Sequence, residues 1–395
     1  MSQKLISLSP DLSRLRSEGY DIEIRGSYLL VKSVPYVNAQ RQVKRGILVS
    51  PLNLAGDRTA RPDNHQVQLA GEFPCHADGT PMNEVVSQSI ETKLDTDLVT
   101  SHWFSQKPKT GFYVDYYEKM ATYAAILSSQ ARVIDPDATP QTYSVEETED
   151  SESPFQYLDT ASSRAEINTI AKKLALSNVG IIGLGGTGSY VLDLVSKTQV
   201  AAIHLFDADK MSTHNAFRSP GAATIEELRE QPLKVEYFRR RYQAMHRGVI
   251  AHGYHLTAAN LSEIQNMDFV FVCIDNGDSK RSIVQALEQY NIPFVDVGMG
   301  LYAKNGAIGG IIRATTSTPA LRSHVYENGR ISFGKPEAEA IYDKNIQIAD
   351  LNALNATLAV IKWKKLFGFY ADNEKEHFTT YTIDCNLLTS EDIND

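Results

Sequence analysis

The chain has 395 residues, 42% of them hydrophobic and 22% charged, with a formal net charge of −9 at pH 7. This length accommodates two domains with at least one sizeable core. The acidic balance, without a dominant basic stripe, argues against nucleic acid as the main partner. No apolar run approaches the length of a membrane span and the N-terminus lacks the apolar stretch of a signal peptide. We therefore expect a cytoplasmic protein with no membrane contact.

The three cysteines, Cys75, Cys273 and Cys385, are far apart and have no C-x-x-C spacing. This distribution argues against a disulfide scaffold and against a cysteine zinc site. Cys273 lies in an apolar run and is expected to be buried. Cys75 precedes the turn at Asp78-Gly79 and is the cysteine whose surroundings indicate exposure.

Residues 1–135 predict a small N-terminal α+β domain, whose role the sequence does not reveal. Short β-like runs at 20–24, 28–31 and 66–70 are separated by turn residues. From 116 to 133 the pattern becomes helical, because apolar residues recur at i, i+3, i+4 and i+7. These residues are Met120, Tyr123, Ala124 and Leu127. No catalytic constellation is recognisable in this region.

Residues 136–155 have the composition of a linker. They contain Pro136, Pro140 and Pro154 and an acidic run at 146–150. Such a segment buries too little apolar surface to order itself, so we expect a solvated tether.

Residues 156–395 predict a second domain in which strands and helices alternate. The expected strands lie at 179–182, 202–206, 249–256, 268–274 and 293–297, and the expected helices at 162–176, 232–245 and 279–290. This alternation predicts an α/β fold with a doubly wound, Rossmann-like, mostly parallel sheet. Further strands are expected at 306–315 and 379–383, with an antiparallel arrangement left open. Between them we expect a helix at 347–367 with an apolar stripe formed by Leu351, Leu354, Leu358 and Ile361.

A glycine turn follows the first strand of this second domain and indicates a nucleotide site. Gly183, Gly185 and Gly188 have G-x-G-x-x-G spacing, with Gly186 between them, and the second strand ends at Asp207. Glycines let the backbone approach phosphates, the next helix offers unpaired N–H groups, and the acid accepts ribose hydroxyls.

The polar residues after the glycine turn favour ATP chemistry over hydride transfer. A nicotinamide-dependent dehydrogenase would explain the glycines and Asp207 but not the polar residues at the ends of neighbouring strands. Together these provide carboxylates for ribose and Mg²⁺ and an amide and two cations for a polyphosphate. They are Asp209, Asn215, Arg218, Lys234 and Asp275.

This order of motifs resembles the ThiF/MoeB/E1 superfamily, whose members activate ubiquitin-like proteins, over about residues 162–384. The resemblance implies that Asp207 holds the ribose of ATP, with the glycine turn and Asp209 beside it. Asn215, Arg218 and Lys234 would hold the phosphates, and Asp275 would hold Mg²⁺ and position the attacking carboxylate. In the family an arginine of an N-terminal helix reaches the partner subunit's site, and Arg164 is the candidate by position.

The same resemblance implies an E1-like reaction: ATP- and Mg²⁺-dependent adenylation of the C-terminal glycine of a ubiquitin-like protein. The expected setting is a bacterial conjugation pathway in which a homodimeric enzyme is followed by an E2-like protein, because bacterial E1-like proteins with an unrelated N-terminal domain occur. The chain departs from the family in having Ser219 where many relatives have Gln, and in lacking zinc-binding C-x-x-C pairs. Three alternatives stay open: adenylation of a sulfur-carrier protein in cofactor biosynthesis, an NAD-dependent oxidoreductase, and a non-catalytic scaffold.

Overall fold

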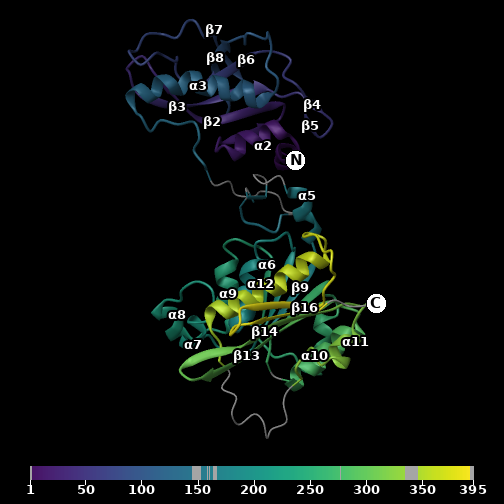
Figure 1. The fold of residues 1–395 in the computed structure, drawn as a ribbon. Coiled ribbons are helices and arrows are strands. Elements are labelled where there is room, and N and C mark those ends of the chain that lie inside the picture. Colours follow the sequence, from purple (N-terminus) through teal and green to yellow (C-terminus); the bar gives the residue numbers. More distant parts are fainter. Residues whose placement is uncertain are drawn as a thin grey trace. The chain divides into compact units, whose positions relative to one another are not determined.

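The computed structural model describes residues 2–144, 153–157, 159, 161–162, 167–275, 277–333 and 346–391. The chain forms two compact units (Figure 1). The N-terminal unit comprises 1–150 and 158–167, and the C-terminal unit comprises 151–157 and 168–395. Within the described ranges, no helix combines the length and apolar character that crossing a bilayer requires.

The N-terminal unit is an antiparallel sheet with helices packed on it. Its six strands have the order β1-β2-β3-β6-β8-β7. They are β1 (Ile22–Arg25), β2 (Tyr28–Val37), β3 (Val43–Pro51), β6 (Gln66–Ala70), β7 (Val86–Lys93) and β8 (Val99–Ser105), with a small hairpin of β4 (Leu54–Ala55) and β5 (Arg58–Thr59). The helices are α1 (Ser2–Leu8), α2 (Pro10–Ser17) and α3 (Tyr116–Ile134).

Helix α3 supplies the centre of this unit's core. The predicted apolar residues Met120, Tyr123 and Leu127 are all buried, and they join a cluster with Leu29 and Val31 of β2. Asp115 caps the helix by accepting a hydrogen bond from the Glu118 N–H. The helical periodicity read from the sequence is thereby confirmed.

Both ends of the predicted linker are ordered parts of the two units. Ala138 is buried, and Gln141 forms a β-bridge with Tyr20 in the N-terminal unit. Phe155 is bridged to His246 in the C-terminal unit, where the two rings meet edge to face at 5.9 Å. The prediction of a solvated tether over all of 136–155 is therefore wrong at both ends, because apolar anchors and backbone pairing order them. The acidic run at 146–150 lies outside the described residues.

The C-terminal unit is built on an eight-stranded sheet with the order β11-β10-β9-β12-β13-β14-β15-β16. The first five strands in this order, β11, β10, β9, β12 and β13, run parallel to one another. Each of the last three, β14, β15 and β16, is antiparallel to the strand before it. The strands are β9 (Asn178–Ile182), β10 (Ala202–Phe206), β11 (Val249–His252), β12 (Phe269–Val272), β13 (Phe294–Lys304), β14 (Ala307–Ser317), β15 (Phe378–Thr382) and β16 (Leu387–Glu391). The predicted doubly wound, mostly parallel fold is confirmed.

Helices cover both faces of the parallel strands, as Figure 1 shows. Along β12, Phe269 and Phe271 face one core, and Val270 and Val272 face the other. This is why the strand reads as a continuous apolar run. The first core is closed by α6 (Gly186–Val195), α9 (Lys234–Tyr242) and α12 (Ala349–Leu366), and the second by α10 (Gly277–Gln289) and α11 (Ser323–Glu327). Short helices α7 (Thr213–Ala216), α8 (Ile225–Glu230) and the 3-10 turn η2 (Leu261–Ile264) lie in the connections.

Two predicted helices differ from the structure. In place of one helix over 162–176, the described part has α5 (Asn168–Ala171) and the 3-10 turn η1 (Lys172–Leu174). In α12, the fully buried side chains include Asn352, Ala356 and Trp363, so the buried face is rotated from the predicted leucine stripe. The leucine pattern predicted the wrong buried face because the actual inner face contains two asparagines and several alanines, which are not recognised as core residues from the sequence.

Lys119 of α3 is a buried ammonium in the N-terminal unit. It is 1% exposed, and its Nζ donates hydrogen bonds to Ser50 Oγ at 2.9 Å and to Asn64 Oδ1 at 3.4 Å. Among the described residues, no carboxylate oxygen lies within ion-pair distance of it. Because burial disfavours the charged form, the pKa of Lys119 falls to about 8.

This pKa predicts a rise in stability at alkaline pH. Between pH 8 and 10.5 the folded protein releases the Lys119 proton while the unfolded chain keeps it, so the free energy of unfolding increases with pH. Lys119→Met lacks this titrating group. Between pH 8 and 9.5 the free energy of unfolding of the wild-type protein should therefore rise by on the order of 1 kcal/mol more than that of the variant. Urea unfolding at several pH values measures this divergence, and parallel profiles would contradict it.

Candidate nucleotide-binding site

The glycine turn joins β9 to α6, and each glycine in it has a different neighbour. Gly183 has a φ of +89°, which favours glycine, and it lies against Cys273 and Ile274 after β12. A Cβ on Gly188 would lie 1.9 Å from the Gly183 carbonyl oxygen. Around Gly185, by contrast, a Cβ would meet no atom within 4 Å, so only this glycine of the turn faces open space. Of the four predicted glycines, Gly185 is therefore the one that a phosphate could approach.

Asp207, at the end of β10, holds the glycine turn in place. It is 8% exposed, and its Oδ2 accepts a hydrogen bond from the Leu184 N–H at 2.7 Å. Its Oδ1 accepts from the Asp209 N–H at 2.8 Å. One carboxylate thus fixes both the turn after β9 and the loop after β10. A ribose hydroxyl would have to share these oxygens with the backbone.

Lys234, the first residue of α9, connects the two aspartates. Its side chain is 8% exposed, and its Nζ lies 2.7 Å from Asp209 Oδ2 and 3.5 Å from Asp207 Oδ2. The hydrogen bond from Lys234 lowers the pKa of Asp209, although Asp209 itself is 61% exposed. The backbone secures the same junction, because the Lys234 N–H donates to the Asp209 carbonyl at 2.8 Å. The site therefore places a cation between two acids, close to the glycine turn.

Asn215 and Arg218 lie on and just after the short helix α7. Asn215 is 2% exposed, and its Oδ1 accepts hydrogen bonds from the Ser212 N–H and hydroxyl. Asn215 Nδ2 and Arg218 Nε are buried donors without a partner among the described residues. Ser219 donates through its hydroxyl to the Asn215 carbonyl at 2.6 Å, so it stabilises this turn. Within the described ranges, no hydrogen bond joins Asn215 or Arg218 to Asp207 or Lys234.

Asp275 follows β12, next to the glycine turn in the sheet. The neighbouring Cys273 N–H donates to the Ile182 carbonyl at 2.8 Å, which pairs the end of β12 with the end of β9. Asp275 is exposed, as a residue that meets a ligand must be. Arg164, the other predicted catalytic residue, lies outside the described residues.

Two buried polar clusters beside the site were not expected. Asp296 of β13 is fully buried between Lys280 of α10, at 2.7 Å, and Arg313 of β14, at 3.1 Å. On the other face, Asn352 of α12 accepts a hydrogen bond from the Thr187 hydroxyl in the glycine turn. The sequence held one hint of each cluster: Asp296 is a charged residue in a predicted buried strand, and Asn352 is a polar residue in a predicted apolar helix.

The cysteines differ from expectation in one respect. Cys75 is buried, and burial raises the pKa of its thiol, so the expected exposure was wrong. The β-bridges of Cys75 with Val37 and Pro81 place it inside the N-terminal unit. Cys273 is partly buried with a raised thiol pKa, and Cys385 is the exposed one.

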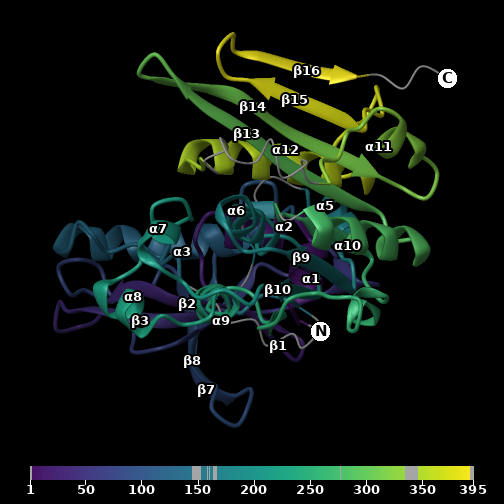
Figure 2. The ribbon, with the colours of Figure 1, turned by 90° about the horizontal axis from the view of Figure 1, so that it is seen from below.

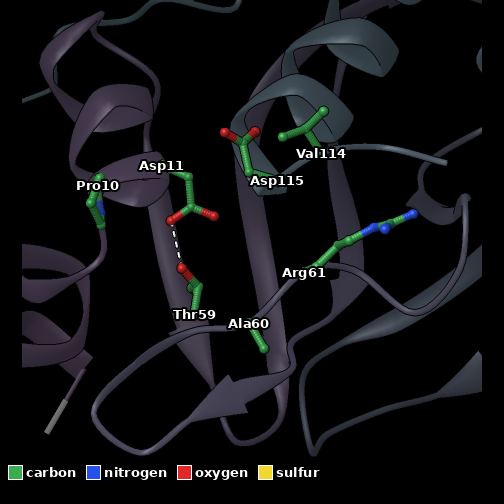
Figure 3. Close-up of a pocket in the computed structure, with 7 residues that line it drawn as sticks. All are labelled: Pro10, Asp11, Thr59, Ala60, Arg61, Val114 and Asp115. Carbon is green, nitrogen blue, oxygen red and sulfur yellow. Dashed lines mark hydrogen bonds between the residues drawn. The ribbon is translucent and has the colours of Figure 1, made fainter. Parts of the chain in front are cut away.

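A hollow of about 240 Å³ lies in the N-terminal unit, where α2, β5 and the start of α3 meet (Figure 3). Asp11 at its wall accepts hydrogen bonds from the Thr59 hydroxyl at 2.6 Å and from the Tyr116 N–H at 3.1 Å. Its carboxylate therefore joins three elements of the unit. We assign this hollow a structural role and place the candidate site at the glycine turn.

The chain belongs to the ThiF family, because residues 159–391, more than half of its length, match the model of that family. This confirms the family resemblance that the motifs indicated. Residues 10–160 match a domain of unknown function, DUF6791.

Curated relatives include ubiquitin-like modifier-activating enzyme 5 from Drosophila mojavensis, 26% identical over 148 residues, covering 33% of this chain and 35% of the relative. The Drosophila melanogaster protein is 24% identical over 153 residues, covering 35% and 37%. The chain thus spans about a third of the length of these relatives. Among solved structures, E. coli MccB with ATP has a TM-score of 0.44 at 16% identity, covering 57% of this chain and 66% of that one. PaaA has a TM-score of 0.44 at 15% identity, covering 57% and 76%.

The different surroundings of two glycines predict different outcomes for two alanine variants. Gly188→Ala should destabilise the protein by about 3 kcal/mol or more, because its Cβ would overlap the Gly183 carbonyl. Gly185→Ala should lose less stability, about 1 to 2 kcal/mol, because no atom lies near its Cβ position and the cost comes from its backbone ψ of −147°, which lies outside the usual β range of other residues. Chemical denaturation compares them, and equal losses of stability would contradict the assigned geometry.

Proposed function

We propose that the C-terminal unit adenylates the C-terminal glycine of a ubiquitin-like protein, using ATP and Mg²⁺. Two observations support this proposal. The chain belongs to the ThiF family, and Asp207 links the glycine turn to Lys234, a set of contacts that we call the Asp207 joint. This joint brings backbone amides, a buried cation and an open glycine to one edge of the sheet. Ligands bind at this edge in doubly wound folds.

In the proposed reaction, an oxygen of the partner's C-terminal carboxylate attacks the α-phosphorus of ATP. A bond forms between that oxygen and phosphorus, the bond to the bridging oxygen breaks, and pyrophosphate leaves with both bonding electrons. An anion attacks a polyanion here, so fixed positive charge must lower the repulsion. Lys234 and Arg218 are the cations assigned to this role, and the first N–H groups of α6 would bind phosphate oxygens.

Asp275 is the residue assigned to Mg²⁺. Its exposed carboxylate offers the hard oxygen ligand that this ion prefers. Among the described residues, no three acidic, histidine or cysteine side chains form a metal cage. That agrees with a Mg²⁺ held by one or two carboxylates together with substrate phosphates, which is its usual mode. When bound, the ion neutralises charge on the phosphates.

The names of the curated relatives support this substrate class, since they are called ubiquitin-like modifier-activating enzymes. We extend that class to this chain and place the reaction in a ubiquitin-like conjugation pathway with an E2-like protein as the next acceptor. Adenylation of a sulfur-carrier protein would use the same residues, and a binding partner from sulfur transfer would favour it.

Pyrophosphate exchange tests the proposed reaction. The protein should exchange labelled pyrophosphate into ATP only with Mg²⁺ and a partner ending in glycine. Asp275→Asn should reduce the exchange rate by about 100-fold or more, because the substitution removes the carboxylate charge from the metal site. An unfolding curve of the same variant separates a loss of exchange from a loss of folding.

Asp278→Asn is the matched control, because Asp278 is also exposed and lies three residues further on, in the first turn of α10. It should exchange pyrophosphate at the wild-type rate. Normal exchange in Asp275→Asn would remove this residue from the mechanism. Equal losses of exchange in both variants would show that the effect is not specific to Asp275, and would contradict its assignment to Mg²⁺.

We also propose that the C-terminal unit forms a homodimer. The inner face of α12 is buried within its own unit, so that helix is a poor interface. Strands β13 to β16 instead expose Tyr302, Ile311 and Leu387, each about half accessible. The register places these three on one face: Ile311 pairs with Thr382, which pairs with Leu387, and Tyr302 pairs with Gly309, two residues before Ile311 on β14. Figure 2 shows this antiparallel part of the sheet.

Sedimentation velocity at micromolar concentration should show a dimer, and the double substitution Ile311→Lys, Leu387→Lys should convert it into a folded monomer. A charged side chain in place of each apolar one makes burial of that face unfavourable. Glu226→Lys, at an exposed position of α8 in the connection after β10, should leave the dimer intact. A monomeric wild-type protein that is fully active would contradict the dimer and, with it, a role for Arg164 in the partner subunit's site.

A further inference from the structure

The glycine turn is held from a second side by a residue far away in the sequence. Asn352, in the first turn of α12, receives a hydrogen bond from the Thr187 hydroxyl at its Oδ1, over 2.9 Å. A Cβ on Gly186 would lie 2.0 Å from Asn352 Nδ2. The Asn352 carboxamide therefore fills the space that a side chain at position 186 would need. Position 186 therefore requires glycine because of its contact with α12, and not because a ligand needs access there.

The choice of asparagine at position 352 is not explained by stability. Asn352 is fully buried, and its Nδ2 has no hydrogen-bond partner among the described residues. A buried donor without a partner destabilises the folded protein, whereas Ala359 and Val360 on the same helix fill the core with apolar side chains. An unfavourable residue in a core is expected where function requires it.

We propose that Asn352 is a positioning residue that sets the shape of the phosphate-binding turn. Because the side chain is fully buried, it acts on the nucleotide through Thr187 and Gly186 and does not touch it. The first N–H groups of α6 belong to these same residues and lack partners within the helix. Their directions depend on how firmly the turn is held, so the contact from α12 adjusts the affinity for phosphate. This inference rests on the proposed function of the turn in binding ATP.

Asn355 provides a matched control on the same helix. It is 1% exposed, and its Nδ2 donates a hydrogen bond to the Gly298 carbonyl of β13 at 3.0 Å. Its Oδ1 is also a buried atom without a partner among the described residues. Asn352→Ala and Asn355→Ala thus each remove one buried carboxamide and one hydrogen bond, and only the first contacts the glycine turn.

The experiment measures ATP affinity by calorimetry and amide hydrogen exchange over residues 183–188. Asn352→Ala should bind ATP about tenfold more weakly and exchange faster at these amides, because the loss of one hydrogen bond loosens the turn. Asn355→Ala should bind ATP within about twofold of wild type, although both variants lose thermal stability. Equal affinity and exchange in Asn352→Ala and wild type would overturn the inference.

Thr187 gives a second route should Asn352→Ala fail to fold. Thr187→Val keeps the side-chain shape but lacks the hydroxyl, so it should reproduce the weaker binding. Thr187→Ser retains the hydroxyl and should restore wild-type affinity. If wild type binds no ATP, the proposed function fails and this inference with it. If wild type binds ATP and Thr187→Val binds it equally well, the inference alone fails.

Discussion

The hydrogen bond from the Leu184 N–H to the Asp207 carboxylate is the interaction on which the candidate site depends. It joins the ends of β9 and β10, which are neighbouring parallel strands. The second oxygen of the same carboxylate orders the loop that carries Asp209, and the Lys234 ammonium lies within ion-pair distance of both acids. A buried carboxylate is stable only with such partners. The arrangement of the turn, the loop and α9 therefore follows from satisfying one acid.

The rest of the C-terminal unit supports this joint from both faces of the sheet. On one face α12 reaches the turn through Asn352, and on the other α10 sends Lys280 to the buried Asp296. Parallel strands buried on both sides allow this, because helices cover both faces. The antiparallel strands β14 to β16 extend the sheet beyond the nucleotide edge and carry exposed apolar side chains. In our proposal they provide the surface for a second copy of the chain.

Motifs that depend on local chemistry could be predicted from the sequence. The strand–turn–helix unit at 179–195 and the strand ending at Asp207 were recognisable because glycines at this spacing, followed by an acid at a strand end, are typical of nucleotide-binding βαβ units. Contacts between distant segments could not be predicted. Asn352 lies 165 residues from Thr187, and nothing local indicates that its carboxamide faces Gly186. Likewise, Ala138 and Phe155 looked like linker residues, because their burial depends on partners elsewhere in each unit.

Equilibrium binding of ATP and NAD⁺, measured side by side on the intact chain with Mg²⁺ present, tests the central claim most directly. Both ligands present a ribose and phosphates to a glycine turn, so the turn alone does not choose between them. A buried lysine beside the turn and an exposed carboxylate at the next strand end favour a triphosphate with its metal ion. The account predicts that ATP binds in the micromolar range and that NAD⁺ does not compete with it. Tight binding of NAD⁺ without binding of ATP would contradict it.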